Sequence, residues 1–338
     1  MKRWLFSAAF VVVLVFAFGM AYLALYRDVA KERCQELGLP FPTVMAHRGA
    51  SYLAPEETEW AYRLARAAGA DFLEADVQRS KDGVLFVLHD DTLERTTNVK
   101  TVFPGREKEP VSTFFWEELS RLDAGSWWNQ RHPERAKQEF ANARLLRVEE
   151  LVDLALESNP PTGIYLETKS PEHFPDIETD LVKLLSRRGY GAPSRRPELR
   201  GKLVFQSFSA DSLRKFATLT KDIPRIYLLD EDMVQKQGFG RLLSIAKEVG
   251  HGIGPVGYFA YPWHTHRAHA QGLVVHAWTL NQGWQLRLLR FFGIDGAFTD
   301  RSELAVPLWG RGKTQSQDEL WQKALASRKD TDYSAKKP

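Results

Sequence analysis

Residues 43–91 carry the main evidence for the fold of this chain, and they read TVMAHRGASYLAPEETEWAYRLARAAGADFLEADVQRSKDGVLFVLHDD. This stretch contains three short apolar runs, and each run ends in ionisable residues. The runs are 44–46 before His47-Arg48-Gly49, 72–73 before Glu74-Ala75-Asp76, and 84–88 before His89-Asp90-Asp91. Such runs predict buried strands. Ionisable residues at the ends of several strands are typical of the catalytic face of a parallel β/α barrel.

Carboxylates are the most informative of these residues. Side chains two apart on a strand face the same way, so Glu74 and Asp76 project together, and Glu167 ends a later apolar run. Converging carboxylates repel one another, and a hard divalent cation such as Mg²⁺ or Ca²⁺ resolves that conflict. The alternative is a structural network in which a carboxylate pairs with Arg48 or Lys169.

Two histidines at strand ends suit acid–base chemistry. His47 and His89 could flank one phosphate, because imidazole donates or accepts a proton near neutral pH. Asp90 either orients His89 or caps a helix. Arg48 and Lys169 either contact phosphate oxygens or neutralise the carboxylates, and the two roles are compatible.

The remaining chain alternates between apolar runs and segments of helical spacing. The runs begin near residues 43, 72, 84, 164, 203, 226, 273 and 296. About eight strands predict a TIM (β/α)8 barrel over residues 43–305. Residues 92–147 break the alternation and indicate an insertion after the third strand, whereas 250–257 is a short glycine-rich element. Residues 306–338 form a polar tail that we expect to fray.

The N-terminus predicts a membrane segment. Trp4 to Tyr26 contains no charged residue and follows Lys2-Arg3, so residues 1–26 suit a transmembrane anchor, with a cleaved signal peptide as the alternative. Residues 27–42 are then a linker. We expect a single-pass protein whose catalytic domain lies on the extracytoplasmic side.

Composition excludes other classes. The net charge of +3 is too small to indicate nucleic-acid binding. The single cysteine, Cys34, excludes an intramolecular disulfide and a cysteine-based metal site. Nothing in the sequence indicates the oligomeric state.

The order of the motifs resembles the glycerophosphodiester phosphodiesterase family. That family has HRG, PENT, E-x-D and a strand ending in HD, which stand here as His47-Arg48-Gly49, Pro55-Glu56-Glu57-Thr58, Glu74-Ala75-Asp76 and His89-Asp90. The resemblance continues to about residue 305 and includes Asp123-Ala124-Gly125-Ser126-Trp127, which is similar to the family's DAGSW. One residue departs from the pattern, because Glu57 replaces the family's Asn.

The resemblance implies a metal-dependent enzyme that cleaves glycerophosphodiesters to sn-glycerol 3-phosphate and an alcohol. It implies one divalent cation, Mg²⁺ or Ca²⁺, held by Glu74, Asp76 and Glu167. His47 and His89 match the catalytic histidines. The residues that match the substrate-binding region are Arg48, Lys169, Trp278, Phe208 and Glu56, of which Glu56 is expected to brace the site.

Several residues keep two interpretations. Trp278 either walls the alcohol moiety or packs in the core, and Phe208 is a weaker candidate of the same kind. Trp127-Trp128 forms either a local hydrophobic staple or a substrate wall. Glu57 is expected to face solvent, with weakened phosphate binding as the alternative. His264, His266 and His269 are expected on an exposed polar face, because their spacing is not a strong ligand pattern.

Three hypotheses for the activity follow. The first is hydrolysis of water-soluble glycerophosphodiesters, through attack by the neighbouring glycerol hydroxyl or by water. The second is a lysophospholipase D-type activity on membrane lysophospholipids, suggested by the apolar N-terminus and the aromatic insertion. The third is a non-catalytic barrel that binds a ligand, for which Glu57 is the one indication.

Overall fold

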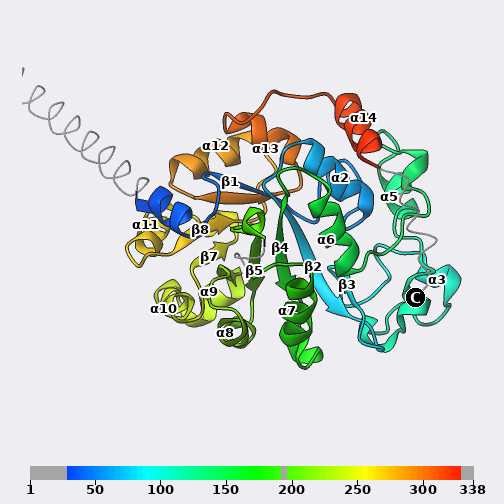
Figure 1. Ribbon diagram of the computed structural model, residues 1–338, viewed down its shortest axis with the longest axis horizontal. Helices are drawn as coiled ribbons and strands as arrows, with labels where there is room; N and C mark the ends of the chain where they lie inside the picture. The colour runs from blue at the N-terminus through cyan, green and yellow to red at the C-terminus, as the bar shows by residue number, and fades with distance from the viewer. Residues whose placement is uncertain (1–28, 192–195, 329–338) are drawn as a thin grey trace, which may run out of the picture.

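Eight parallel strands close into a barrel in the computed structural model, which describes residues 29–191 and 196–328. Strand β1 pairs with β9 on one side and with β2 on the other, so the ring is complete, and helices surround it (Figure 1). The barrel strands are β1 Thr43–Ala46, β2 Phe72–Arg79, β4 Gly163–Thr168, β5 Leu203–Ser207, β6 Arg225–Leu229, β7 Gly252–Pro255, β8 Val274–Ala277 and β9 Gly296–Thr299. The predicted TIM-barrel class is confirmed.

One predicted barrel strand lies outside the barrel. Residues Leu85–Val87 form β3, which pairs antiparallel with β2, with Val77 opposite Val87. A parallel partner would need a crossover of about a dozen residues or more. Only a short turn through Lys81-Asp82-Gly83 separates the two strands, so it permits a hairpin and no crossover.

The strand that the prediction lacked is β7, which was expected only as a glycine-rich element. Its neighbours leave no room for side chains at its glycines. A Cβ on Gly252 would lie 2.5 Å from a Val274 methyl carbon, and one on Gly254 would lie 2.6 Å from a Leu228 methyl carbon. The two errors cancel in number, so the predicted count of eight is correct although one member is wrong.

Helices follow the strands and cover the outside of the barrel (Figure 1). Thr58 caps α2 by accepting a hydrogen bond from the Ala61 backbone N–H, and the face with Trp60 and Leu64 is buried. The α-helices around the barrel are α2 Glu59–Ala67, α6 Val148–Leu156, α7 Ile177–Arg187, α8 Ala210–Leu219, α9 Glu231–Gln237, α10 Phe239–Val249, α11 Pro262–His269, α12 Gly283–Phe291 and α13 Ser302–Leu308. Short 3₁₀ turns are η3 Pro171–His173, η4 Pro197–Leu199 and η5 Gly257–Phe259.

The insertion between β3 and α6 is a set of short helices. They are α3 Val99–Val102, η1 Val111–Thr113, α4 Trp116–Leu119, α5 Ser126–Arg131 and η2 Gln138–Phe140. Trp128 is buried and meets Phe140 edge-to-face, with ring centroids 5.4 Å apart. Trp127 is half-buried, and its indole N–H donates to the Ala124 carbonyl. These contacts support the staple interpretation.

The expected fraying tail is wrong for the residues described beyond α13. Residues Gln317–Ser327 form α14, which lies beside α2 (Figure 1). Trp321 packs between Trp60 and Phe140, at ring-centroid distances of 4.9 and 5.5 Å. A capping box at Ser316 starts this helix. Residues 329–338 lie outside the described part of the chain.

The segment expected as a linker is part of the core where it is described. Residues 29–36 are helical, and Cys34 and Leu39 are buried against inward-facing side chains of the barrel, among them Phe72 and Val204. The predicted membrane anchor, residues 1–26, lies outside the described residues. Within those residues, no helix combines the length and apolar character that a bilayer crossing needs.

Candidate active site

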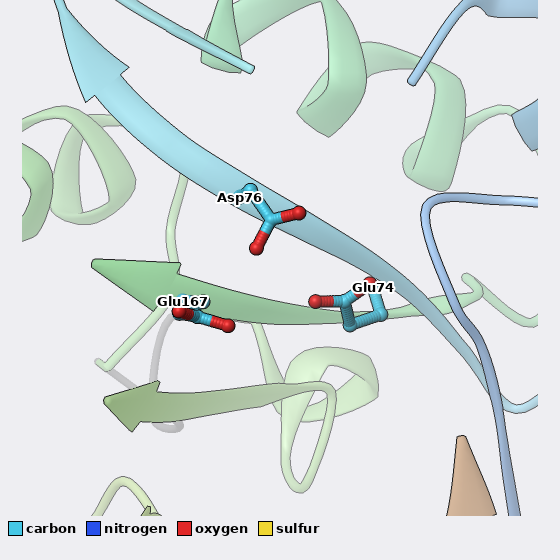
Figure 2. Close-up of side chains that lie close together, drawn as sticks. All are labelled: Glu74, Asp76 and Glu167. Carbon is cyan, nitrogen blue, oxygen red and sulfur yellow. The ribbon is translucent and has the colours of Figure 1, made fainter. Parts of the chain in front are cut away.

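Three carboxylates converge at one end of the barrel. Glu74 and Asp76 extend from β2 and Glu167 from the adjacent β4, and their side chains point into the same space (Figure 2). One oxygen of each lies within 4.8 Å of the others. Asp76 and Glu167 are register partners, which explains the convergence. The three side chains are buried, at 1%, 1% and 6% exposure.

This cluster is electrostatically unbalanced by itself. Burial and the neighbouring Asp76 raise the pKa of Glu167 to about 8. Burial, Asp76 and Glu167 also hold the pKa of Glu74 well above its usual value. Burial alone would raise the pKa of Asp76, but Lys169 and Arg48 lower it to about 2. An all-oxygen donor set with surplus negative charge fits a hard divalent cation.

Two cations border the carboxylates. Lys169 Nζ lies 3.0 Å from Glu167 and 3.9 Å from Asp76, and Arg48 Nε lies 3.3 Å from Asp76 Oδ2. The Arg48 backbone N–H donates to Glu74 at 2.7 Å. Both cations therefore make the contacts expected if they neutralise the carboxylates. Both also line the central cavity, so contact with a bound phosphate is compatible with these contacts.

Each of the two predicted histidines is held by a carboxylate. His47 Nδ1 lies 2.7 Å from Asp300 Oδ1, and His89 Nδ1 lies 2.7 Å from Asp90 Oδ1. With Nδ1 engaged, Nε2 is the ring nitrogen that remains for a substrate. Asp90 orients His89, as one of its two predicted roles required.

A cavity of about 110 Å³ joins these groups. Its aromatic wall is made by Phe208 and Trp278, which meet edge-to-face at 5.7 Å. The Trp278 indole N–H donates to the Gly254 carbonyl at 2.6 Å, which fixes the ring. The lining residues are His47, Arg48, Glu74, Asp76, His89, Glu167, Lys169, Gln206, Phe208, Leu228, Trp278 and Phe298. All the predicted site residues except Glu56 are present.

Glu56, which was predicted among the substrate-binding residues as a brace, does not line the cavity and instead contacts two arginines. It accepts from Arg48 at 3.0 Å and from Arg95 at 2.7 and 2.8 Å. Arg95 also donates to Asp90 at 2.5 and 2.9 Å. Glu56 therefore links the arginine of the first motif to the carboxylate that orients His89.

The expectation that Glu57 faces solvent is wrong. Its side chain is 3% exposed, and Oε1 accepts a hydrogen bond from the Asp76 backbone N–H at 2.7 Å. Burial, and then Asp76, raise the pKa of Glu57 well above its usual value. Its φ of 56° is left-handed, a conformation that Asn tolerates better than Glu. Glu57 is thus a fourth buried carboxyl group, in contact with a member of the cluster.

The three histidines near residue 266 do not form the expected exposed face. His269 is buried and lies 2.9 Å from Asp295, and His264 stacks on Phe239 at 3.9 Å. His266 is half-buried. In the described chain, the one group with metal-binding spacing is Glu74, Asp76 and Glu167.

Four residues that contact the site residues had no predicted role. They are Asp300, Asn281, Gln206 and Arg95. Asn281 donates to Asp300 at 2.5 Å, and Gln206 donates to Glu74 at 2.9 Å. Asp300 directly follows β9, so the rule that ionisable residues at strand ends form the site would have found it.

A profile of the glycerophosphoryl diester phosphodiesterase family matches residues 47–304. The chain belongs to this family. It is 33% identical to the glycerophosphodiester phosphodiesterase of Bacillus subtilis over 260 residues, which are 77% of this chain and 84% of that protein.

Solved structures agree with this assignment. A phosphodiesterase from Oleispira antarctica, in complex with the product sn-glycerol-3-phosphate, matches with a TM-score of 0.62 and 25% identity, over 80% of this chain and 97% of that one. The glycerophosphodiester phosphodiesterase of Agrobacterium tumefaciens matches with a TM-score of 0.59 and 25% identity, over 78% and 98%. The chain is therefore a glycerophosphodiester phosphodiesterase.

Proposed function

We propose that this enzyme hydrolyses glycerophosphodiesters to sn-glycerol 3-phosphate and an alcohol, with His47 and His89 as its acid–base pair. The observation that carries the proposal is the matched environment of the two rings. Each imidazole lines the same cavity and has Nδ1 at 2.7 Å from a carboxylate, Asp300 or Asp90. A base and an acid are both needed, because one proton leaves the nucleophile and another reaches the departing alkoxide.

Glu74, Asp76 and Glu167 would hold one divalent cation, Mg²⁺ or Ca²⁺. When bound, such a cation neutralises phosphate charge and polarises the phosphoryl group. Arg48 and Lys169 border the same space and would hold the phosphate oxygens, with the guanidinium contacting two oxygens at once. Phe208 and Trp278 would exclude water from one side of the substrate.

In the proposed first step, the glycerol hydroxyl beside the phosphoester attacks phosphorus, and the bond to the head-group oxygen breaks. One imidazole takes the hydroxyl proton, and the other gives a proton to the departing alcohol. Water then opens the cyclic phosphate with the two imidazoles in reversed roles. Holding the nucleophile within the substrate removes much of the entropic barrier. Full activity on a diester without that hydroxyl, with no trapped cyclic phosphate, would favour direct attack by water.

The apolar stretch Trp4–Tyr26 supports a second part of the proposal, a single-pass membrane anchor with the catalytic domain on the extracytoplasmic side. Flotation of the full chain with vesicles after a high-salt wash is the expected result. Recovery of the protein in the soluble fraction would refute the membrane anchor without affecting the catalytic proposal.

The catalytic proposal is tested by measuring sn-glycerol 3-phosphate released from glycerophosphocholine and glycerophosphoethanolamine, with EDTA, Mg²⁺ or Ca²⁺. Release should require a cation, and His47→Ala and His89→Ala should each abolish it. His173→Ala changes an exposed histidine outside the cavity and should retain the wild-type rate. Turnover by both cavity variants at the wild-type rate would refute the two-histidine mechanism.

A further inference from the structure

The chain joins the barrel at the end opposite the carboxylates. Cys34 and Leu39 pack against Phe72, the first residue of β2, whereas Asp76 lies four residues further along the same strand. Arg33 Nε donates to the carbonyl of Gly272, just before β8 begins. Residues 29–42 therefore close the base of the barrel, the end where the parallel strands begin.

The join between the apolar stretch and this base is short. Tyr26, the last residue of the uncharged stretch, precedes Val29 by three residues, which span at most about 11 Å. Cys34 is fully buried, so residues 29–36 cannot leave the base without breaking core contacts. A bilayer crossed by the apolar stretch would therefore lie close to the base.

We infer that the base of the barrel is the surface held against the bilayer, and that the catalytic cavity opens away from it. This inference rests on the proposed membrane anchor. It assigns an orientation, and through it a class of substrate, to the proposed function.

The charge of the base suits an anionic lipid surface. A hollow of about 460 Å³ lies between the entry segment and the loops that precede β5 and β6. Four basic residues, Arg33, Arg196, Arg200 and Lys221, line it together with the acidic Glu36 and Asp222. Of these, Arg200 and Lys221 are exposed basic residues. Among the described residues, neither has a carboxylate partner within 4.0 Å. Exposed basic side chains are attracted to an anionic lipid surface.

The orientation decides which substrates can reach the carboxylates. Asp76 lies about 13 Å along β2 from Phe72, since each residue advances a strand by about 3.3 Å. The helical segment 29–36 adds its own thickness beneath Phe72. A lipid phosphate stays within a headgroup layer only about 5–7 Å thick. A lysophospholipid in the bilayer therefore cannot reach the cavity, and glycerophosphodiesters arrive from the aqueous phase.

Exposed aromatic side chains at the other end of the barrel suggest the alternative orientation, in which the open end faces the bilayer. Tyr258, Tyr261 and Trp263 follow β7, and Trp284 begins α12 after β8, with exposures of 54%, 40%, 59% and 63%. Such residues can bind a bilayer interface. With residues 29–36 docked on the base, the bilayer that the adjacent anchor crosses lies at the opposite end of the barrel from these side chains.

The experiment uses two variants of the full-length protein, each with one fluorescent label, so that one label lies at each end of the barrel. Asp222→Cys is at the base and Glu172→Cys follows β4 at the open end; both are exposed acidic positions, so the charge change is matched. The native Cys34 is fully buried and should not react with the label. The labelled proteins are reconstituted in phosphatidylcholine–phosphatidylglycerol vesicles that contain a headgroup quencher.

Quenching at least threefold stronger at position 222 than at position 172 is the expected result. Equal quenching, or stronger quenching at 172, would overturn the orientation while flotation still supports the anchor. If the protein does not float with the vesicles, the anchor and the orientation are both overturned.

The unlabelled full-length protein, reconstituted in the same vesicles, should hydrolyse glycerophosphocholine at least tenfold faster than lysophosphatidylcholine held in its own bilayer. Comparable rates on the two substrates would overturn the substrate assignment. Loss of both activities in detergent as well as in vesicles would instead refute the catalytic proposal.

Discussion

Asp300 Oδ1 lies 2.7 Å from His47 Nδ1, although 253 positions of sequence separate the two residues. Asn281 holds the other Asp300 oxygen at 2.5 Å. The carboxylate is thus fixed in place, and it accepts the Nδ1 proton of His47. This contact leaves His47 Nε2 as the nitrogen that exchanges a proton with the substrate.

We expect Asp300→Asn to lower kcat about 100-fold while KM changes little, because an amide can stabilise the wrong imidazole tautomer. Steady-state kinetics with glycerophosphocholine across pH 5–9 measure the effect and the change in the pH profile. Asp91→Asn, at an exposed position outside the cavity, is the matched control and should behave as wild type. An unchanged kcat in Asp300→Asn would mean that Asp300 does not position His47.

Glu57 should make stability fall as pH rises. Its pKa is raised in the folded protein, so the folded state keeps a proton that the unfolded chain releases above its ordinary pKa of about 4.3. Glu57→Gln can keep the acceptor for the Asp76 N–H without the titration. In urea unfolding with EDTA, we expect the variant to be more stable by about 1 kcal/mol or more at pH 8, with little difference at pH 4.

Glu172→Gln is the control for that series, because this exposed side chain should leave the free energy of unfolding unchanged at both pH values. A constant difference between Glu57→Gln and wild type across the range would show that Glu57 does not titrate in the folded protein.

Cation binding should release protons near neutral pH. The pKa of Glu167 is about 8, and that of Glu74 is also raised, whereas a cation needs both as carboxylates. Affinity for Mg²⁺ or Ca²⁺ should therefore rise between pH 6 and pH 9. Isothermal titration calorimetry at pH 7, in buffers of different ionisation enthalpy, measures the protons released.

The sign of the stability effect follows from the same shifts. Without a cation, the folded state loses stability as pH rises from about 4.3 towards the raised pKa values, and a bound cation should restore it most strongly at high pH. Cation binding without proton release would contradict the protonation that burial imposes on this cluster.

The cluster itself was predictable, because local spacing places Glu74 and Asp76 on one face and strand ends of a parallel barrel meet. Contacts between residues that lie far apart in the sequence could not be predicted in this way. No spacing rule links His47 to Asp300, and the Glu57 contact with the Asp76 backbone depends on a left-handed turn that the sequence does not reveal.

The barrel strands illustrate a second limit. β3 is rich in apolar residues yet lies outside the barrel, whereas the glycine-rich β7 belongs to it. Apolar content indicates burial and not the partner. The short turn before β3 and the close neighbours of Gly252 and Gly254 decided the arrangement, and both are questions of space rather than of hydrophobicity.

The C-terminal helix gives the remaining test, because its role in the core was missed. Trp321 is buried between Trp60 and Phe140, so Trp321→Ala removes a large side chain from a packed site. We expect the free energy of unfolding to fall by about 3 kcal/mol, as for other buried aromatic truncations. Urea denaturation measures it, and Gln322→Ala, at the exposed neighbouring position, should change it by less than about 0.5 kcal/mol. If both variants were equally stable, α14 would contribute nothing to the fold and the barrel would be independent of the residues after α13.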